Sequence, residues 1–332
     1  MHMSDALLSP AVAGTMYAAS GVAVGAAIAK LRKSQGEVKI AEAGVMGAFV
    51  FAAQMINFSI PGTGSSGHLC GGMLLSAVLG PAAGFLTMAG VLLVQCLLFA
   101  DGGILAYGAN LWNMAFYGCM LGGGVIWPLF TKGRATRARI FAACIIGNII
   151  ALQLGAFSVT LETLASGVTE LPFKTFVLAM LPIHLAIGAV EGVITGAVLC
   201  FINETRPEML MVEGRGAESR FSRLAVLSTL AAAAFAIGVF LSLAASSSPD
   251  GLEWSMEKVA GTAELERADA IHSRAAEVQD SIALLPDYNL PDSESAGGNM
   301  LSGFVGTGLV LLLCVLGGTL FRRRNRGGFA ES

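Results

Sequence analysis

Charged residues are scarce in this chain. Asp, Glu, Lys and Arg make up 13% of its 332 residues, whereas hydrophobic residues make up 55% and the mean hydropathy is +0.70. Soluble globular proteins carry about 25% charged residues. The shortage excludes an ordinary cytosolic protein and a disordered chain, and the recurring apolar runs of about 20 residues indicate a polytopic membrane protein.

Several functional motifs are also missing. The six cysteines form no C-x-x-C pair and all lie in apolar runs, so we expect buried thiols rather than a disulfide framework or a zinc site. Without G-x-x-x-x-G-K-[ST] the chain cannot hydrolyse ATP by the P-loop mechanism, and without H-E-x-x-H it lacks the usual intramembrane zinc protease signature. No basic stripe with interleaved aromatic residues points to a nucleic-acid partner.

Nine apolar segments follow one another along the chain, and we expect a helix in each. They lie at approximately 10–29, 40–60, 69–80, 83–100, 108–130, 140–161, 175–202, 224–246 and 301–321. One helix over residues 69–100 would be about 48 Å long against a hydrocarbon core of about 30 Å, so we expect Gly80-Pro81 to divide it. The prediction is an all-α polytopic membrane protein with about nine transmembrane helices.

The basic residues support this division. Sixteen of the 20 Lys and Arg lie in four clusters: Lys30, Arg32, Lys33 and Lys39; Lys132, Arg134, Arg137 and Arg139; Arg206, Arg215, Arg220 and Arg223; Arg322, Arg323, Arg324 and Arg326. These clusters share one side of the membrane only if 69–80 and 83–100 form a hairpin. By the positive-inside rule we predict a multi-pass protein of the inner (plasma) membrane, with an extracytoplasmic N-terminus and a cytoplasmic C-terminus.

The chain is predicted to have three parts. A seven-helix core (1–202) is followed by a cytoplasmic linker (203–222) and a two-helix module (223–332). The loop 247–300 of that module carries 11 acidic residues against three basic ones, and by parity it is extracytoplasmic. We expect mixed helical character over 252–282, loop structure over 284–302, and a solvated surface position for His272.

The N-terminus itself is a candidate metal ligand. No basic region or cleavage site precedes the first apolar segment, so we expect Met1 to remain on the mature chain. A free α-amine, the amide nitrogen of residue 2 and the imidazole of His2 can chelate one ion, and three nitrogens in a plane suit Ni(II) or Cu(II). The alternative is that a histidine at position 2 is there by chance.

A second histidine lies on the same predicted face. His68 ends the Gly- and Ser-rich loop 61–68 and is the only histidine in an outer loop of the predicted core. It could supply a fourth metal ligand, or it could simply cap the helix that follows. Asp101, Asn110 and Asn113 lie at the same predicted membrane side, where they could orient a ligand histidine or make polar contacts between helices.

Two ionisable residues lie within a predicted membrane helix. His184 and Glu191 are seven residues apart and therefore share one helix face. Such groups are expensive inside a membrane and are functional candidates, although a neutral histidine and a protonated or hydrogen-bonded glutamate can be structural. They support two alternative functions: a membrane metalloenzyme that uses His68, His184 and Glu191, or a proton-coupled transporter with Glu191 as the carrier.

Several segments resemble the CbiM/NikM family, the substrate-capture components of energy-coupling-factor transporters for cobalt and nickel. They are MHMSDALLSP (1–10), GSSGHLCGG (64–72), LFADGG (98–103), GANLWNM (108–114) and GAVEGVIT (188–195). In addition, PDGLE at 249–253 resembles the small CbiN/NikN-type subunit, here fused to the core.

This resemblance implies a transport component rather than an enzyme. In the family the metal lies in a square plane of nitrogens, and these ligands correspond to the amine of Met1, the amide and imidazole of His2, and His68. Ni²⁺ or Co²⁺ would be the transported substrate, without an organic cofactor, and the square-planar geometry favours nickel. The implied partners are a transmembrane coupling component and cytoplasmic ATPase subunits.

Overall fold

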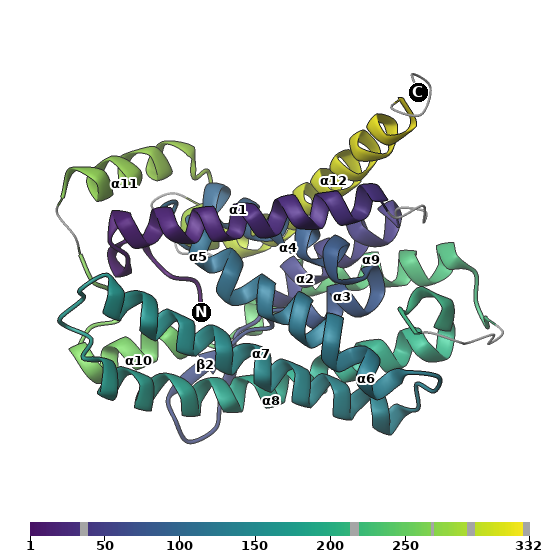
Figure 1. Cartoon of the computed structure of the whole chain (residues 1–332), viewed down its shortest axis with the longest axis horizontal. Coiled ribbons are helices and arrows are strands. Elements are labelled where there is room, and N and C mark those ends of the chain that lie inside the picture. Colours follow the sequence, from purple (N-terminus) through teal and green to yellow (C-terminus); the bar gives the residue numbers. More distant parts are fainter. Residues whose placement is uncertain (34–38, 213–218, 267–268, 291–295, 328–332) are drawn as a thin grey trace.

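A computed structural model describes residues 1–33, 39–212, 219–266, 269–290 and 296–327, and this part of the chain is mainly helical (Figure 1). The helices are α1 (Pro10–Lys33), α2 (Ile40–Gln54), α3 (Gly72–Leu79), α4 (Pro81–Leu98), α5 (Tyr107–Asn110), α6 (Trp127–Thr131), α7 (Arg137–Ala165), α8 (Phe173–Thr205), α9 (Arg223–Val239), α10 (Gly251–Ala260), α11 (Ala270–Ile282) and α12 (Ala296–Gly327). A π-helical stretch, η2 (Leu111–Ile126), joins α5 and α6 into one continuous helix. Short 3₁₀ turns are η1 (Asp5–Leu7), η3 (Pro207–Met209), η4 (Leu241–Ala244) and η5 (Pro286–Tyr288), and the strands β1 (Phe58–Ile60) and β2 (Ser65–Gly67) pair antiparallel.

The apolar helices correspond to the nine predicted segments. Six helices in the described residues are long and apolar enough to cross a membrane, namely α1, α4, the continuous helix α5–α6, α7, α8 and α12. The shorter apolar helices α2 and α9, together with α3, complete the set. Many of the large apolar side chains on the outside of these helices are exposed, as expected for surfaces that face lipid. The prediction of an all-α polytopic membrane protein is confirmed.

The third predicted segment is not a membrane-spanning helix. At 1.5 Å per residue the eight residues of α3 rise only about 12 Å, and all eight are buried. The predicted division between α3 and α4 is confirmed at Gly80, which has φ +85°, a conformation that glycine adopts without strain. Helix α2 also ends at Gln54 rather than near residue 60, because residues 58–60 form β1 instead.

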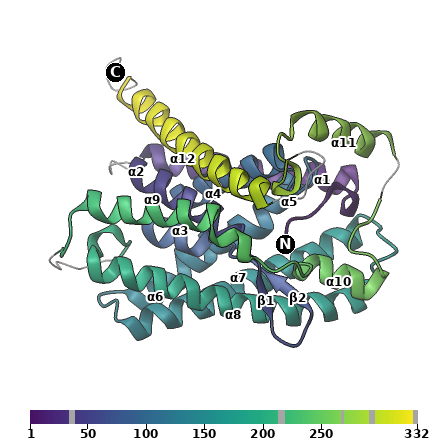
Figure 2. The same cartoon turned by 180° about the vertical axis from the view of Figure 1, so that it is seen from behind.

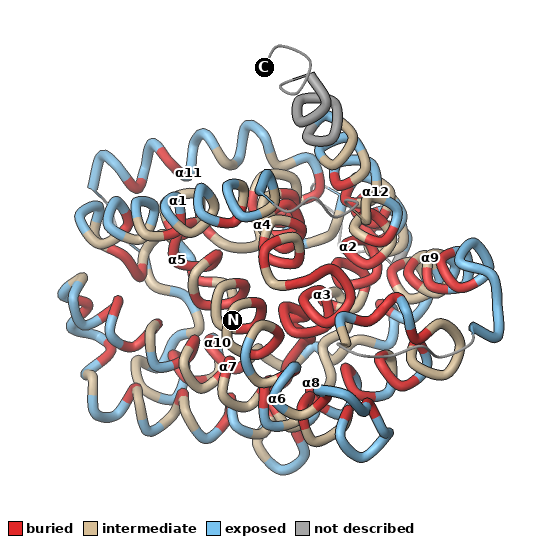
Figure 3. The backbone as a smooth tube through the Cα atoms, turned by 45° about the vertical axis from the view of Figure 1, so that its right-hand side comes forward, coloured by how far each residue is buried: buried red, intermediate tan, exposed pale blue. Residues whose placement is uncertain are grey.

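Because α3 is so short, it leaves room within the bundle for other parts of the chain. The β1–β2 hairpin and residues 68–71 lie between α2 and α3, and the N-terminal segment lies close to them. Figure 2 shows the N-terminus ending in the interior of the fold. Met1, Met3, Leu7 and Leu8 are all buried. In Figure 3 the buried residues concentrate around α3 and the N-terminus, while α1 and α11 expose their outer faces.

Two of the basic clusters make side-chain bonds near the start of α2. Lys39 Nζ donates to the carbonyl oxygens of Val78 and Met209, each at 2.8 Å. The Arg223 guanidinium forms two bonds to the carboxylate of Glu42. Arg215 lies outside the described residues, and so do the side chains of Arg322, Arg323, Arg324 and Arg326.

The C-terminal part of the chain contributes two helices to the bundle and two to the N-terminal end of the molecule. Helices α9 and α12 pack against α2, whereas α10 and α11 lie at the end that holds the N-terminus (Figure 2). The loop predicted over 284–302 is shorter than expected, because α12 begins at Ala296. The surface position predicted for His272 is wrong: its ring is 5% exposed, and Nε2 lies 2.9 Å from the Leu8 carbonyl oxygen.

Candidate metal centre

The N-terminal amine lies beside His68. The distance from the Met1 nitrogen to His68 Nε2 is 3.0 Å, and both residues are buried. Two neighbouring ligands that each lie about 2 Å from one metal ion in a square plane are separated by about 2.8 Å. The separation of these two nitrogens therefore suits two adjacent ligands of one ion. The ring of His2 stacks on that of His68 with centroids 5.3 Å apart.

The position of the amine is set by bonds to the next residues of the chain. The side chain of Asn110 holds both main-chain groups of Met3: Oδ1 accepts from the amide at 2.7 Å, and Nδ2 donates to the carbonyl at 3.1 Å. The same carbonyl accepts from the Gly103 amide at 3.0 Å. Asp5 accepts from the Ala106 amide at 2.9 Å. Hydrogen bonds of Met3 and Asp5 thus hold the N-terminal segment in place on both sides of Ser4.

Among the described residues the asparagines form no hydrogen bond to a histidine. Asn113 makes the other kind of contact that the sequence left open, a polar contact between helices, because its amide donates to Glu162 Oε2 at 2.8 Å. Asn110 instead holds Met3. It thereby helps to place the main chain whose first two nitrogens are the candidate ligands.

Asp101 does contact a candidate ligand, as predicted. Its Oδ1 lies 3.0 Å from His2 Nδ1, while Gln95 Oε1 lies 3.2 Å from His2 Nε2. The terminal chelate needs Nδ1 itself. A half-turn of the ring about Cβ–Cγ brings Nε2 to the present place of Cε1, between the two oxygen acceptors, and frees Nδ1. A neutral ring carries one hydrogen, which Nδ1 donates to Asp101 in this structure; in the turned ring this hydrogen would lie on Nε2, within reach of both acceptors.

The tautomer of His68 is suited to metal binding. Its Nδ1 lies 3.2 Å from the Leu69 carbonyl oxygen, which can only accept, so Nδ1 carries the hydrogen and Nε2 presents a lone pair. The neighbouring Gly67 lets β2 lie against α8, because a Cβ at this position would come within 2.7 Å of Ile187. The hairpin thus brings His68 close to the helix that carries His184.

A carboxylate from the C-terminal part completes the surroundings of the amine. Asp250 Oδ2 forms an ion pair with the Met1 amine and lies 3.8 Å from His68 Nε2. Its other oxygen caps α10 by accepting from the amides of Leu252 and Glu253. The sequence signal for the capping role of Asp250 is the D-x-x-E spacing of a capping box, which the side chain of Glu253 completes.

The segment that carries Asp250 is bonded to the β2 strand. The Ser66 amide donates to the Pro249 carbonyl at 2.8 Å, and the Ser66 hydroxyl donates to the Ser248 carbonyl at 2.7 Å. The Trp254 indole donates to the Thr63 carbonyl at 3.0 Å. The PDGLE segment and the His68 loop are therefore held together by hydrogen bonds to main-chain carbonyl oxygens.

Burial and the neighbouring charges set the protonation of these groups. Burial lowers the pKa of His68 to about 3, and the positive amine contributes in the same direction. Burial also lowers the pKa of His2. For the Met1 amine, burial alone would lower the pKa, but the Asp250 carboxylate more than offsets it, so the pKa is raised. At neutral pH both imidazoles are neutral ligands, and the amine is an ammonium group paired with Asp250.

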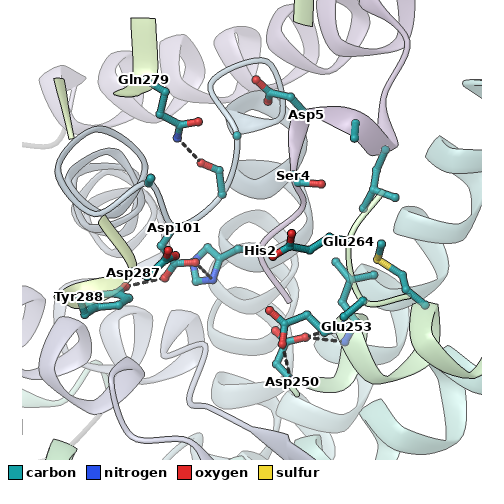
Figure 4. A pocket seen from close by; sticks show the side chains of 18 of the residues that line it. His2, Ser4, Asp5, Asp101, Asp250, Glu253, Glu264, Gln279, Asp287 and Tyr288 are labelled. Atoms are coloured by element: carbon teal, nitrogen blue, oxygen red, sulfur yellow. Dashed lines mark hydrogen bonds and ion pairs between the residues drawn. The ribbon is translucent and has the colours of Figure 1, made fainter. Parts of the chain in front are cut away.

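A large acidic cavity opens beside the centre (Figure 4). Its volume is about 760 Å³, and no Lys or Arg is among the described residues that line it. Seven carboxylates line it: Asp5, Asp101, Asp250, Glu253, Glu264, Glu266 and Asp287. This excess of negative charge attracts cations. No three His, Cys, Asp or Glu side chains of the described residues come together as a metal site, so a centre here depends on the main-chain nitrogens.

Tyr288 is a site residue that the sequence analysis did not find. Its hydroxyl donates to Asp101 Oδ2 and accepts from the Gln95 amide, so it joins the two groups that hold His2. The ring stacks on Phe99 with centroids 4.7 Å apart. Both Tyr288 and Ala100 have positive φ values, 60° and 54°, a strained conformation for residues with a side chain. No sequence motif marks this position.

His184 and Glu191 lie on the face of α8 that meets the His68 loop, and both are buried. Glu191 Oε1 accepts from the Gly71 amide at 2.9 Å, at the start of α3. His184 lines a small cavity together with Met1 and His68. The prediction that both share one face is confirmed, and this face points toward the candidate centre.

The fold and the site define a membrane transport protein for transition metals. A solved structure described as a truncated transition metal transporter superposes with a TM-score of 0.53 and 31% identity, covering 61% of this chain and 99% of that one. Residues 2–209 match the family called cobalt uptake substrate-specific transmembrane region, CbiM, and residues 224–323 match the PDGLE domain. The chain belongs to the CbiM family, as a nickel or cobalt transport component and not an enzyme.

The similar proteins are described as nickel or cobalt transport proteins, and one of them matches nearly the whole chain. The chain is 35% identical over 313 residues to a protein of Archaeoglobus fulgidus described as a fused nickel transport protein, NikMN, covering 94% of this chain and 96% of that protein. It is 32% identical over 223 residues to the fused nickel transport protein NikMN of Rhodobacter capsulatus, covering 63% and 64%. The cobalt transport protein CbiM of Sorangium cellulosum is 30% identical over 173 residues, covering 50% and 74%.

Proposed function

We propose that this chain captures Ni(II) or Co(II) in a square plane of four nitrogens. The ligands are the amine of Met1, the amide nitrogen and Nδ1 of His2, and Nε2 of His68. The observation that carries this proposal is the buried amine 3.0 Å from His68 Nε2. Nitrogen ligands in a plane suit Ni(II) better than Co(II), and the Archaeoglobus fulgidus relative, which matches 94% of this chain, is described as a fused nickel transport protein, so nickel is the favoured substrate.

Capture exchanges protons for the metal ion. The ammonium group of Met1 and the amide of His2 each lose a proton to water, and the ring of His2 turns and moves its hydrogen from Nδ1 to Nε2, so that Nδ1 offers a lone pair. Asp250 then gives up its bond to an N–H of the ammonium group and leaves a negative charge beside the bound cation. Asp101 and Gln95 accept from the turned ring and hold it in the plane, as second partners of a ligand histidine commonly do.

The proposed orientation follows from the charge distribution, the division of the chain from the layout of its apolar segments, and the partners from the resemblance to the CbiM/NikM family. The acidic cavity faces outside the cell and gathers cations, and the N-terminus lies at that side, whereas the basic clusters and the C-terminus lie in the cytoplasm. Residues 1–202 form the capture core, 203–222 the linker, and 223–332 the module that closes the centre. Uptake requires a transmembrane coupling component and cytoplasmic ATPase subunits of an energy-coupling-factor transporter.

The decisive experiment compares the purified full chain with a variant that carries one additional residue before Met1. Calorimetry measures the affinity for Ni(II) and Co(II), and absorption detects the band of square-planar Ni(II). We expect the native chain to bind one ion and the extended chain to lose both the affinity and the band, because the extension displaces the amine from its place beside His68. Equal affinity in both proteins would refute the terminal chelate.

The role of the C-terminal loop needs a second experiment. Replacing residues 247–300 by a short Gly- and Ser-rich linker removes Asp250 and Tyr288 together. We expect uptake by cells that contain the complete transporter to fall, while the N-terminal part stays folded as judged by its thermal unfolding. Unchanged uptake would show that the module does not help to load or release the metal.

A further inference from the structure

A second cavity, much smaller than the first, adjoins the candidate centre. Its volume is about 10 Å³, and Met1, His68, Asp250, Gly251 and His184 are among its lining residues. A cavity of about 10–15 Å³ on this measure has room for a single water molecule. The space between the two histidines is therefore of the size that one water or one dehydrated metal ion requires.

The ring of His184 presents a lone pair to this space. Its Nδ1 lies 2.8 Å from the Met180 carbonyl oxygen, which can only accept, so Nδ1 carries the hydrogen and Nε2 does not. Nε2 is buried and has no hydrogen-bond partner among the described residues. A buried acceptor without a partner is unfavourable, and the same arrangement of a ring held through Nδ1 is typical of histidines that bind metals.

The PDGLE segment leaves this nitrogen uncovered. A Cβ on Gly251 would lie 3.1 Å from His184 Nε2 and 2.8 Å from Ile187 Cδ1. Any larger residue at position 251 would therefore press on α8 and close the access to the lone pair. The same segment places Asp250 against the amine of Met1. Both features keep a passage open between the terminal chelate and His184.

We propose that His184 Nε2 is the next ligand of the metal on its way from the terminal chelate into the membrane bundle. This inference rests on the proposed function. As a bond from the ion to His184 forms, the bond to the Met1 nitrogen breaks, and the released amine takes up a proton from water and pairs again with Asp250. The position is transient, because no three metal-binding side chains of the described part of the chain gather there as a site. Imidazole is a suitable ligand for both Ni(II) and Co(II).

The test separates capture from delivery. His184→Gln keeps a polar group on α8 but removes the imidazole. The control Thr195→Val, on the same helix, removes a buried hydroxyl that also has no hydrogen-bond partner among the described residues. We expect His184→Gln to bind Ni(II) within about threefold of the native affinity but to lower uptake by the complete transporter at least about tenfold. Thr195→Val should match the native chain in both. Gly251→Ala should lower uptake in the same way, because its methyl group covers Nε2.

Two results would overturn the proposal for His184, and a third would overturn the proposed function. Uptake by His184→Gln within about twofold of native would overturn the proposal for His184. Loss of Ni(II) affinity as severe as that of a His68 variant would make His184 a ligand of the capture centre instead, and would also overturn it. If the chain extended before Met1 binds Ni(II) as the native one does, the proposed function fails, whatever the His184 variant shows.

Discussion

The N-terminal and C-terminal parts of the molecule meet at the metal centre with different chemistry. The N-terminal part supplies nitrogen: the amine of Met1 and the imidazoles of His2 and His68. The C-terminal part supplies oxygen, through the carboxylate of Asp250 and the hydroxyl of Tyr288. Nitrogen ligands select a transition metal, whereas these oxygens hold the metal-free ligands in place. In the proposed function the two parts thus divide metal binding and ligand placement between them.

The largest effect should come from replacing His68, one of the two side chains that contact the Met1 amine; the other is Asp250. His68→Gln removes a proposed ligand, so we expect the Ni(II) affinity to fall about 100-fold or more. Asp250→Asn keeps the α10 cap but removes the negative partner of the ammonium group, so it should change the affinity far less at pH 8. Calorimetry on both variants measures the difference. Equal losses would mean that Asp250 is itself a metal ligand.

The pH dependence should be controlled by the amine and not by His68. The pKa of the Met1 amine is raised, so at pH 7 the metal must displace its proton as well as that of the His2 amide. Affinity should therefore fall about 100-fold for each unit of pH below 8, a factor of about ten per displaced proton. His68, with a pKa of about 3, stays neutral throughout this range.

Asp250→Asn sharpens this test. Without the carboxylate the pKa of the amine falls, because its ammonium form loses the ion pair that favours it. The acid limb of the affinity profile should then move to lower pH than in the native chain. Titrations with Ni(II) from pH 5.5 to 8.5 compare the two proteins. A profile that depends on a single proton, or that moves to higher pH in the variant, would contradict the terminal chelate.

Tyr288→Phe should have a smaller effect. The ring and its stacking on Phe99 remain, but Asp101 and Gln95 lose their common partner, so His2 is held less firmly. We expect the Ni(II) affinity to fall about tenfold, the lower end for residues that orient a ligand. Tyr17→Phe, on a hydroxyl that bonds the Ile104 carbonyl instead, is a matched control with native affinity expected. A native affinity for Tyr288→Phe would restrict this residue to packing.

The smallest effect should concern the docking of α11. His272 bonds Asp269 and the Asp5 and Leu8 carbonyls, and although burial opposes its protonation, these acceptors raise its pKa. A raised pKa stabilises the contact fully below the unfolded value and loses this contribution as pH rises through the folded one. Amide protection in α11, corrected for the intrinsic pH dependence of exchange, should therefore be higher at pH 5.5 than at pH 8. His272→Gln should abolish this difference, and a difference that persists would assign it to another group.

Much of the architecture could be predicted from the sequence because apolar runs and clustered charges act locally. Segment positions, the break at Gly80-Pro81 and the candidate ligands Met1, His2 and His68 all follow from short stretches of chain. The length of α3 could not be predicted, because its apolar run continues through residues that form a loop around the N-terminus. The bonds of Asn110 to Met3 were missed for the same reason: nothing local shows that residue 3 lies there.

The sequence by itself determined the class of membrane protein and the chemical identity of the candidate metal ligands. Only the tertiary structure decided that Asp250, Gly251 and Tyr288, nearly 250 residues or more from the N-terminus, lie around those candidates. It also decided that His184 offers to the same place a nitrogen that no described residue bonds. The physical reason is that hydropathy and ligand chemistry belong to single residues, whereas a centre closed by two distant segments depends on how the helices pack.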